Sequence, residues 1–240
     1  MDRARDSLSG RAWRLLAVGA PVAFLALFFL YPVAAIVERG LRGHGDPPLG
    51  VLSDPLTREI VWFTVWQALA STLLTIVVAL PAAYVLGRYR FRGQSVVSAI
   101  VVVPFVLPTV VVALAFIAIL PDGSERGWAP ILIAHAFFNV AVVVRIVGTF
   151  WASLDPRLGE AAATLGASPR VRLREITAPL LAPALAAAAA IVFLFSFTSF
   201  GVVLILGGPR YATLEAEIYN QAVRLFDLRA AAVLSFVKIG

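Results

Sequence analysis

The sequence contains no cysteine and only two histidines, His44 and His135, among its 240 residues. These absences exclude disulfides, thiolate nucleophiles and metal sites built from cysteine or from several histidines. The sequence also lacks the GxxxxGK[ST] phosphate-binding loop and the GxSxG nucleophile elbow. We therefore expect no bound metal, no cofactor, no ATP-binding motif of a familiar kind and no enzyme activity in the chain itself.

Charged residues are also scarce, at 14% of the chain, whereas hydrophobic residues make up 60% and the mean hydropathy is +0.90. Soluble domains of this length rarely have such a composition, which is typical of membrane proteins. In that setting we expect the formal net charge of +6 to lie in loops that set the orientation in the lipid bilayer. The composition predicts an all-α membrane protein that binds no nucleic acid.

Apolar runs divide the chain, and most of them reach the length of about 20 residues that a helix needs to cross a bilayer. A cleaved signal peptide is the alternative for the first run, but the run is too long and no small-x-small cleavage site follows it. The last run stops at Gly240 before it can span, so we expect this sequence to be cut inside a longer chain. The pattern predicts one domain over 1–240, a polytopic helical bundle of about six transmembrane helices at about 15–37, 60–86, 96–120, 129–151, 180–206 and 228–240.

Arginine distribution predicts the orientation of the bundle. The N-terminal segment and the loops at 88–92 and 157–174 are basic. The loops that alternate with them are close to neutral. Because positively charged loops stay on the cytoplasmic side, the N-terminus and the 157–174 loop are predicted to be cytoplasmic.

Four residues within the spans are candidates for lining a pathway. Pro104 and Pro108 lie four apart in the third span, where each removes a backbone hydrogen bond and kinks the helix. This kink either lines a pathway or is an ordinary distortion of packing. His135 and Asn139 lie one helical turn apart in the fourth span. They either line a passage for a polar solute or make an interhelical hydrogen bond that holds the bundle together.

Acidic residues are absent from the middle of the predicted spans. An ion-coupled secondary transporter normally needs such a group, so this alternative function, with that of a channel, loses support. A further part of the chain can still supply the group. A membrane scaffold or a membrane-embedded enzyme is the third alternative, and no cluster of nucleophile, base or metal ligands supports an enzyme.

The longest polar interval between the runs, at 154–179, predicts a helix–turn–helix. Its Asp-Pro pair at 155–156 and its Ser-Pro pair at 168–169 are each typical of an N-cap followed by a first helical residue. Gly166 falls where the first helix needs a left-handed residue at its C-terminus. One face of that helix is predicted to carry Leu158, Ala161, Ala162 and Leu165.

This 154–179 loop resembles the EAA loop of binding-protein-dependent ATP-binding cassette importer permeases of the type I, MetI-like fold. The family's loop reads Glu-Ala-Ala, three residues, Gly, nine residues, Ile, one residue and Leu-Pro. Ala178 stands where the family favours Leu. The matching positions are Glu160, Ala161, Ala162, Gly166, Ile176 and Pro179. The segments 129–145 and 195–222 and the order of the spans also resemble permeases of thiamine and iron(III) importers, from about Thr64 onward.

The resemblance implies a transmembrane permease subunit whose cytoplasmic loop docks its first short helix in a cleft of a separate ATPase subunit. It implies as partners an ATP-binding cassette ATPase dimer, an extracytoplasmic solute-binding protein and a second permease half, which is often fused in the same polypeptide. Closure of the ATPase dimer then rocks the permease halves. The implied substrate is thiamine, with iron(III) close behind. A solvated connector with accidental caps is the alternative for the loop.

Overall fold

A computed structural model of the chain describes residues 16–42, 54–208 and 210–239. All regular structure in these ranges is helical, which confirms the all-α prediction. The basic N-terminal segment and much of the 38–59 loop lie outside the described residues. The chain divides into two compact units, one of Met1–Thr57 with Glu217–Gly240 and one of Arg58–Ala216.

The first unit contains the first predicted span. Leu16–Ala35 is a helix long and apolar enough to cross a membrane, and it includes the π-helical turn η1 (Ala26–Leu30). It leads into α2 (Tyr31–Arg42), against which α13 (Leu228–Ile239) packs. The helix α13 has 12 residues, fewer than a span requires. Asp227 precedes it and caps it, because its carboxylate accepts hydrogen bonds from the backbone N–H groups of the first turn.

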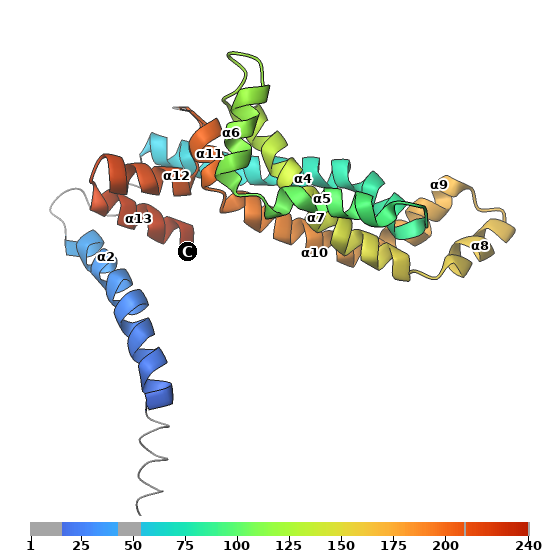
Figure 1. Ribbon diagram of the computed structural model, residues 1–240, viewed down its shortest axis with the longest axis horizontal. Coiled ribbons are helices and arrows are strands. Elements are labelled where there is room, and N and C mark those ends of the chain that lie inside the picture. Colours follow the sequence, from blue (N-terminus) through green and yellow to red (C-terminus); the bar gives the residue numbers. More distant parts are fainter. Residues whose placement is uncertain (1–15, 43–53, 209, 240) are drawn as a thin grey trace, which may run out of the picture. The chain divides into compact units, whose positions relative to one another are not determined.

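The second unit is built on long helices that run side by side in Figure 1: α4 (Pro55–Arg88), α5 (Gln94–Val106), α7 (Trp128–Ser153) and α10 (Ala178–Phe197). Two of them, α4 and α7, and the continuous helix Pro169–Phe197 are long and apolar enough to span a membrane. With Leu16–Ala35 the described residues hold four such helices, or five if the bent pair that follows α4 counts as one span.

That bent pair replaces the single kinked span predicted at 96–120. The helix α5 ends at Val106 and α6 (Thr109–Ile119) departs at 100° to it. Pro108 imposes extended backbone on the residue before it, and Leu107 is extended, with ψ 141°. The predicted kink is therefore confirmed, but the helix breaks completely, as in a broken span or a re-entrant loop.

A second break separates α10 from the short helix α11 (Gly201–Leu206). The two breaks meet, because α11 packs against α6 and a Cβ atom on Gly201 would lie only 2.7 Å from Thr109 Oγ1. Irregular backbone at membrane depth requires cover by protein or by a water-filled cavity. Here α6, which follows the first break, and α11, which follows the second, cover each other. The helix α12 (Leu214–Tyr219) follows.

Close helix contacts hold α4 and α7 together. A Cβ atom on Gly87 would lie 2.5 Å from the carbonyl oxygen of Gly148, and one on Gly148 would lie 3.2 Å from that of Ala83. Small residues at such crossings let the backbones approach, which is how membrane helices gain packing energy. The buried cluster around this crossing consists mostly of small and β-branched residues, including Ala79, Val143, Val147, Ala188 and Val192.

Candidate functional site

The helix α8 (Pro156–Thr164) begins as the sequence predicts. The side chain of Asp155 accepts a hydrogen bond of 2.9 Å from the backbone N–H of Arg157. Pro156 occupies the first helical position, where it loses no hydrogen bond. The N-terminus of this short helix is therefore fixed by its own sequence.

Gly166 ends α8 in the left-handed conformation, with φ +83°. Its N–H donates to Ala163 O, and the N–H of Ala167 donates to Ala162 O, each at 3.0 Å. This pair of bonds is a Schellman motif, which satisfies carbonyls that the helix end leaves without partners. The turn predicted at Gly166 is confirmed.

The second helix of the 154–179 loop differs from the prediction. Ser168 caps α9 (Pro169–Arg172) by accepting a 3.4 Å hydrogen bond from Val171 N–H. No break separates this helix from the fifth predicted span, because α9 continues through the π-helical turn η2 (Leu173–Thr177) into α10. Pro179 lies in the first turn of α10. The π turn shifts the hydrogen-bond register just before a residue that cannot donate, so the helix stays continuous.

The predicted apolar face of α8 is exposed. Leu165 is 88% exposed and Leu158 is 50% exposed, although both belong to the predicted apolar face. Glu160 and Ala161 are exposed as well, and Ala162 is half-buried. An exposed apolar patch at the tip of a loop marks a surface for a partner.

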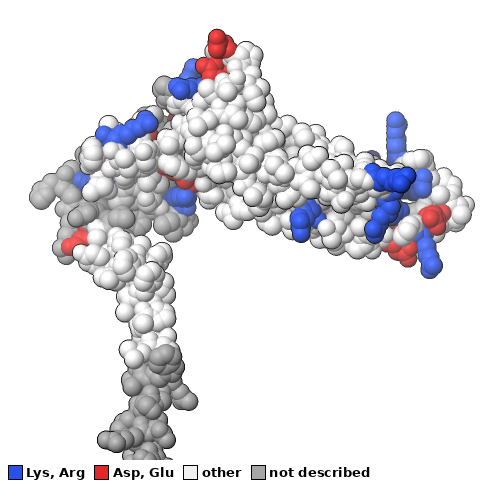
Figure 2. All heavy atoms as spheres, in the orientation of Figure 1, with Lys and Arg blue, Asp and Glu red and all other residues white. Residues whose placement is uncertain are grey.

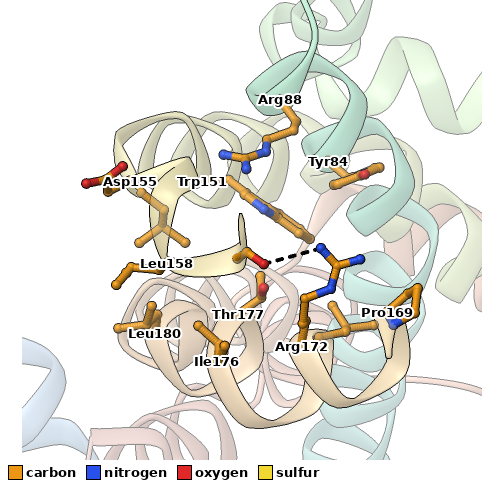
Figure 3. A pocket seen from close by; sticks show the side chains of 13 residues that line it. Tyr84, Arg88, Trp151, Asp155, Leu158, Pro169, Arg172, Ile176, Thr177 and Leu180 are labelled. Atoms are coloured by element: carbon orange, nitrogen blue, oxygen red, sulfur yellow. Dashed lines mark hydrogen bonds between the residues drawn. The ribbon is translucent and has the colours of Figure 1, made fainter. Parts of the chain in front are cut away.

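The inner side of the 154–179 loop encloses a cavity of about 430 Å³, called the loop cavity here (Figure 3). It lies between the ends of α4 and α7 and the helices α8, α9 and η2. Of the motif residues, Ile176 lines it, whereas Pro179 is exposed outside it. The lining residues are Tyr84, Arg88, Trp151, Leu154, Asp155, Leu158, Gly159, Pro169, Arg172, Leu173, Ile176, Thr177 and Leu180.

One side chain spans the loop cavity and ties the two loop helices together. Arg172 Nη1 of α9 donates to the carbonyl oxygen of Gly159 in α8 at 3.4 Å, as the dashed line in Figure 3 shows. Figure 2 shows Lys and Arg side chains gathered at this end of the unit, while the long middle of the helices is mostly uncharged on the visible face. The distribution matches a membrane-embedded middle and a basic loop in water.

His135 lies deep inside the unit, 2% exposed, rather than on an open surface. Its Nδ1 shares a hydrogen bond of 3.1 Å with Ser71 Oγ of α4. This bond links α4 to α7 and is of the interhelical kind that the sequence left as one alternative. Asn139, one turn further along, is 4% exposed. A pathway role for these two residues stays a prediction.

The two prolines lie in different surroundings. Pro104 is half-buried within α5 and lines an apolar cavity of about 430 Å³ together with Leu74 and Phe137. Pro108 is exposed at the bend, where it precedes the first residue of α6. Their role as pathway-lining residues also stays a prediction.

Sequence reasoning missed a buried polar cluster around His135. Gln67 Nε2 donates to Ser196 O, the carbonyl next to the break after α10, at 2.9 Å. Three atoms of the cluster are buried without a partner: Gln67 Oε1, His135 Nε2 and Ser196 Oγ. A helical periodicity of polar residues in α4 was the available signal, since Thr64, Gln67, Ser71 and Thr75 are all 0% exposed.

No group of His, Cys, Asp and Glu among the described residues is arranged to hold a metal ion.

The chain's 76–237 segment matches the family model described as "Binding-protein-dependent transport system inner membrane component". The match includes the whole 154–179 loop.

Two curated relatives align with nearly the whole chain. It is 33% identical to the thiamine transport system permease protein ThiP of Brucella abortus, over 98% of this chain and 46% of that protein. It is 30% identical to the sulfate transport system permease protein CysT of Salmonella typhimurium, over 92% of this chain and 86% of that protein. The chain thus spans about half the length of the thiamine permease relative.

A solved structure has the same fold. It is that of a bacterial ABC transporter involved in the import of the acidic polysaccharide alginate. The TM-score is 0.67 at 18% identity, and the alignment covers 99% of this chain and 93% of the other.

Proposed function

Since the chain belongs to the family of binding-protein-dependent transport system inner membrane components, we propose that it couples ATP hydrolysis by a separate subunit to solute uptake. It is an ABC importer permease subunit, a transport component rather than an enzyme. The observation that carries the coupling role is the exposed apolar face of α8, held on a capped helix–turn–helix outside the membrane-spanning helices.

The structure supports a mechanical route from that face into the membrane. The α8 helix is joined by the Gly166 turn and by the Arg172–Gly159 hydrogen bond to α9. The helix from Pro169 to Phe197 is continuous. A displacement of α8 by a docked ATPase therefore moves the base of a span directly.

The proposed partners are an ATP-binding cassette ATPase dimer, an extracytoplasmic solute-binding protein and a second permease half. A groove of about 820 Å³ between α5, α7 and α10 supports the last of these. Its lining includes exposed apolar rings and the exposed Arg145. A charged side chain within a span normally faces protein or a water-filled cavity rather than lipid, so helices of a second half fit this groove.

For the substrate we propose thiamine, with iron(III) as the second candidate. The proposal rests on the similarity to the thiamine permease relative and on the resemblance of the 129–145 and 195–222 segments. The relative named for sulfate is nearly as similar, at 30% against 33% identity. An uptake assay with competing solutes therefore includes sulfate as a third candidate beside thiamine and iron(III).

Co-purification of the ATPase tests the coupling role. Leu165→Asp places a charge on the most exposed large apolar residue of the 154–179 loop, directly after α8, and we expect it to abolish ATPase binding while the protein still inserts. The matched control is Leu225→Asp, at an exposed leucine outside the 154–179 loop, 61% exposed. If Leu165→Asp and the wild type recovered equal amounts of ATPase, the exposed apolar face of α8 would not be the docking surface.

A further inference from the structure

The loop cavity combines two cationic side chains with two aromatic rings. Arg88 ends α4 and Arg172 ends α9, and both line the cavity. Figure 3 shows their guanidinium groups on either side of the Trp151 indole. The rings of Tyr84 and Trp151 lie 5.0 Å apart, between centroids. A cavity lined in this way has the components that recognise an anionic group at an apolar boundary.

The cationic groups are under-used by the protein. The guanidinium of Arg172 makes one long hydrogen bond, at 3.4 Å, and its Nε is buried without a partner. Within the described residues the side chain of Arg88 makes no hydrogen bond or ion pair. The acidic residue of the lining, Asp155, accepts the Arg157 N–H, and Figure 3 shows its carboxylate directed away from both arginines. Among the described residues, therefore, no carboxylate pairs with either guanidinium group of the cavity.

Its place at the end of the spans points to the membrane surface. The cavity lies where α4 and α7 end, at the side predicted to be cytoplasmic, and Tyr and Trp are enriched at that level of membrane proteins. Leu154, Leu158 and Leu180 add apolar wall beside the arginines. Basic pockets between transmembrane helices on the cytoplasmic side are suited to lipid headgroups.

We propose that the loop cavity binds the phosphate of an anionic lipid from the cytoplasmic leaflet. Arg88 and Arg172 donate to the phosphate oxygens, the aromatic pair lies beside the glycerol region, and the leucines contact the start of the acyl chains. Because its walls come from α4, α7 and the loop helices, the lipid links the 154–179 loop to the bundle. Lipid binding at this site requires the cytoplasmic placement of the loop and does not depend on the transported solute.

The test is lipid binding to the purified full-length protein, without ATPase, by native mass spectrometry. Phosphatidylglycerol is titrated against phosphatidylcholine, and inorganic phosphate is added as a competitor. We expect preferential retention of phosphatidylglycerol, weakened about fivefold for each of Arg88→Gln and Arg172→Gln. Arg172→Lys retains part of the binding. The matched controls are Arg170→Gln and Arg174→Gln, exposed arginines of the same loop that do not line the cavity.

Each contrary outcome overturns the proposal in a distinct way. Unchanged binding in the Arg88→Gln, Arg172→Gln double variant removes the site, and an equal loss in the controls shows unspecific attraction. Displacement by millimolar phosphate indicates a small-anion site instead. Loss of ATPase in a separate co-purification of the Arg88→Gln, Arg172→Gln double variant, with lipid binding unchanged, assigns the arginines to the protein partner. Arg88→Gln breaks no internal hydrogen bond, so it carries the test if the Arg172 variants unfold.

Discussion

The Gly166 turn is the position where a single side chain should uncouple transport without harming insertion. Gly166 has φ +83°, and a Cβ atom placed there would meet nothing within 4 Å. Substitution by valine therefore adds backbone strain and no clash. A β-branched residue in this region of the Ramachandran map is a true outlier, so Gly166→Val should shift the turn to another conformation.

The magnitude follows from the cost of left-handed backbone, about 1–2 kcal/mol for an L-residue other than glycine. This cost lowers the ratio of the native turn to its alternative conformations by a factor of about 5–30. If the ATPase binds only the native turn, its apparent Kd rises by at most the same factor. Asn tolerates the left-handed region, so Gly166→Asn should retain most of the binding.

The assay is solute uptake and ATPase affinity in proteoliposomes, with insertion checked by protein recovery. Gly123→Val is the matched control, because Gly123 has φ +84° and also meets nothing within 4 Å, but lies in the turn between α6 and α7. It imposes the same strain away from the 154–179 loop. Normal uptake by Gly166→Val, or an equal loss in Gly123→Val, would show that the conformation of the Gly166 turn does not control coupling.

Three further predictions concern packing and orientation. Gly87→Ala brings its Cβ within 2.5 Å of Gly148 O and should destabilise the protein by about 1–3 kcal/mol, seen as a lower melting temperature in detergent; an unchanged value would contradict the close α4–α7 crossing. Ser71→Ala removes the 3.1 Å bond to buried His135 and should cost about 0.6 kcal/mol in the same assay, whereas a gain in stability would show that the bond is not favourable. A tag placed after Met1 should be protected from an impermeant reagent in intact cells, and its labelling from outside would reverse the orientation.

Local signals explain why the start and turn of the loop could be predicted. Asp155 and Gly166 act on backbone groups within five residues, so their effect can be read from neighbouring sequence. The continuity of α9 with α10 could not be read in this way. A proline in the first turn of a helix is compatible with a helix that starts there or with one that continues from an earlier helix. Here the π turn η2 joins α9 to α10, so the helix continues.

Distant contacts explain what sequence reasoning missed. Pro104 and Pro108 predict a kink, but the 100° bend also depends on where α6 packs, against Gly201 and its helix. The bond from Gln67 to Ser196 O joins residues 129 positions apart. It can form only because the break after α10 brings a carbonyl to α4. Such pairs require the tertiary structure, whereas the polar periodicity of α4 was visible in advance.

The central claim is tested most directly by ATP hydrolysis in liposomes that contain the full-length protein, its ATPase and its solute-binding protein. We expect hydrolysis to be stimulated by thiamine rather than by iron(III) or sulfate, and to be lost in Leu165→Asp. Stimulation by another solute would keep the permease role and replace the substrate. Failure of any ATPase to bind the intact 154–179 loop would show that the loop is not a coupling element.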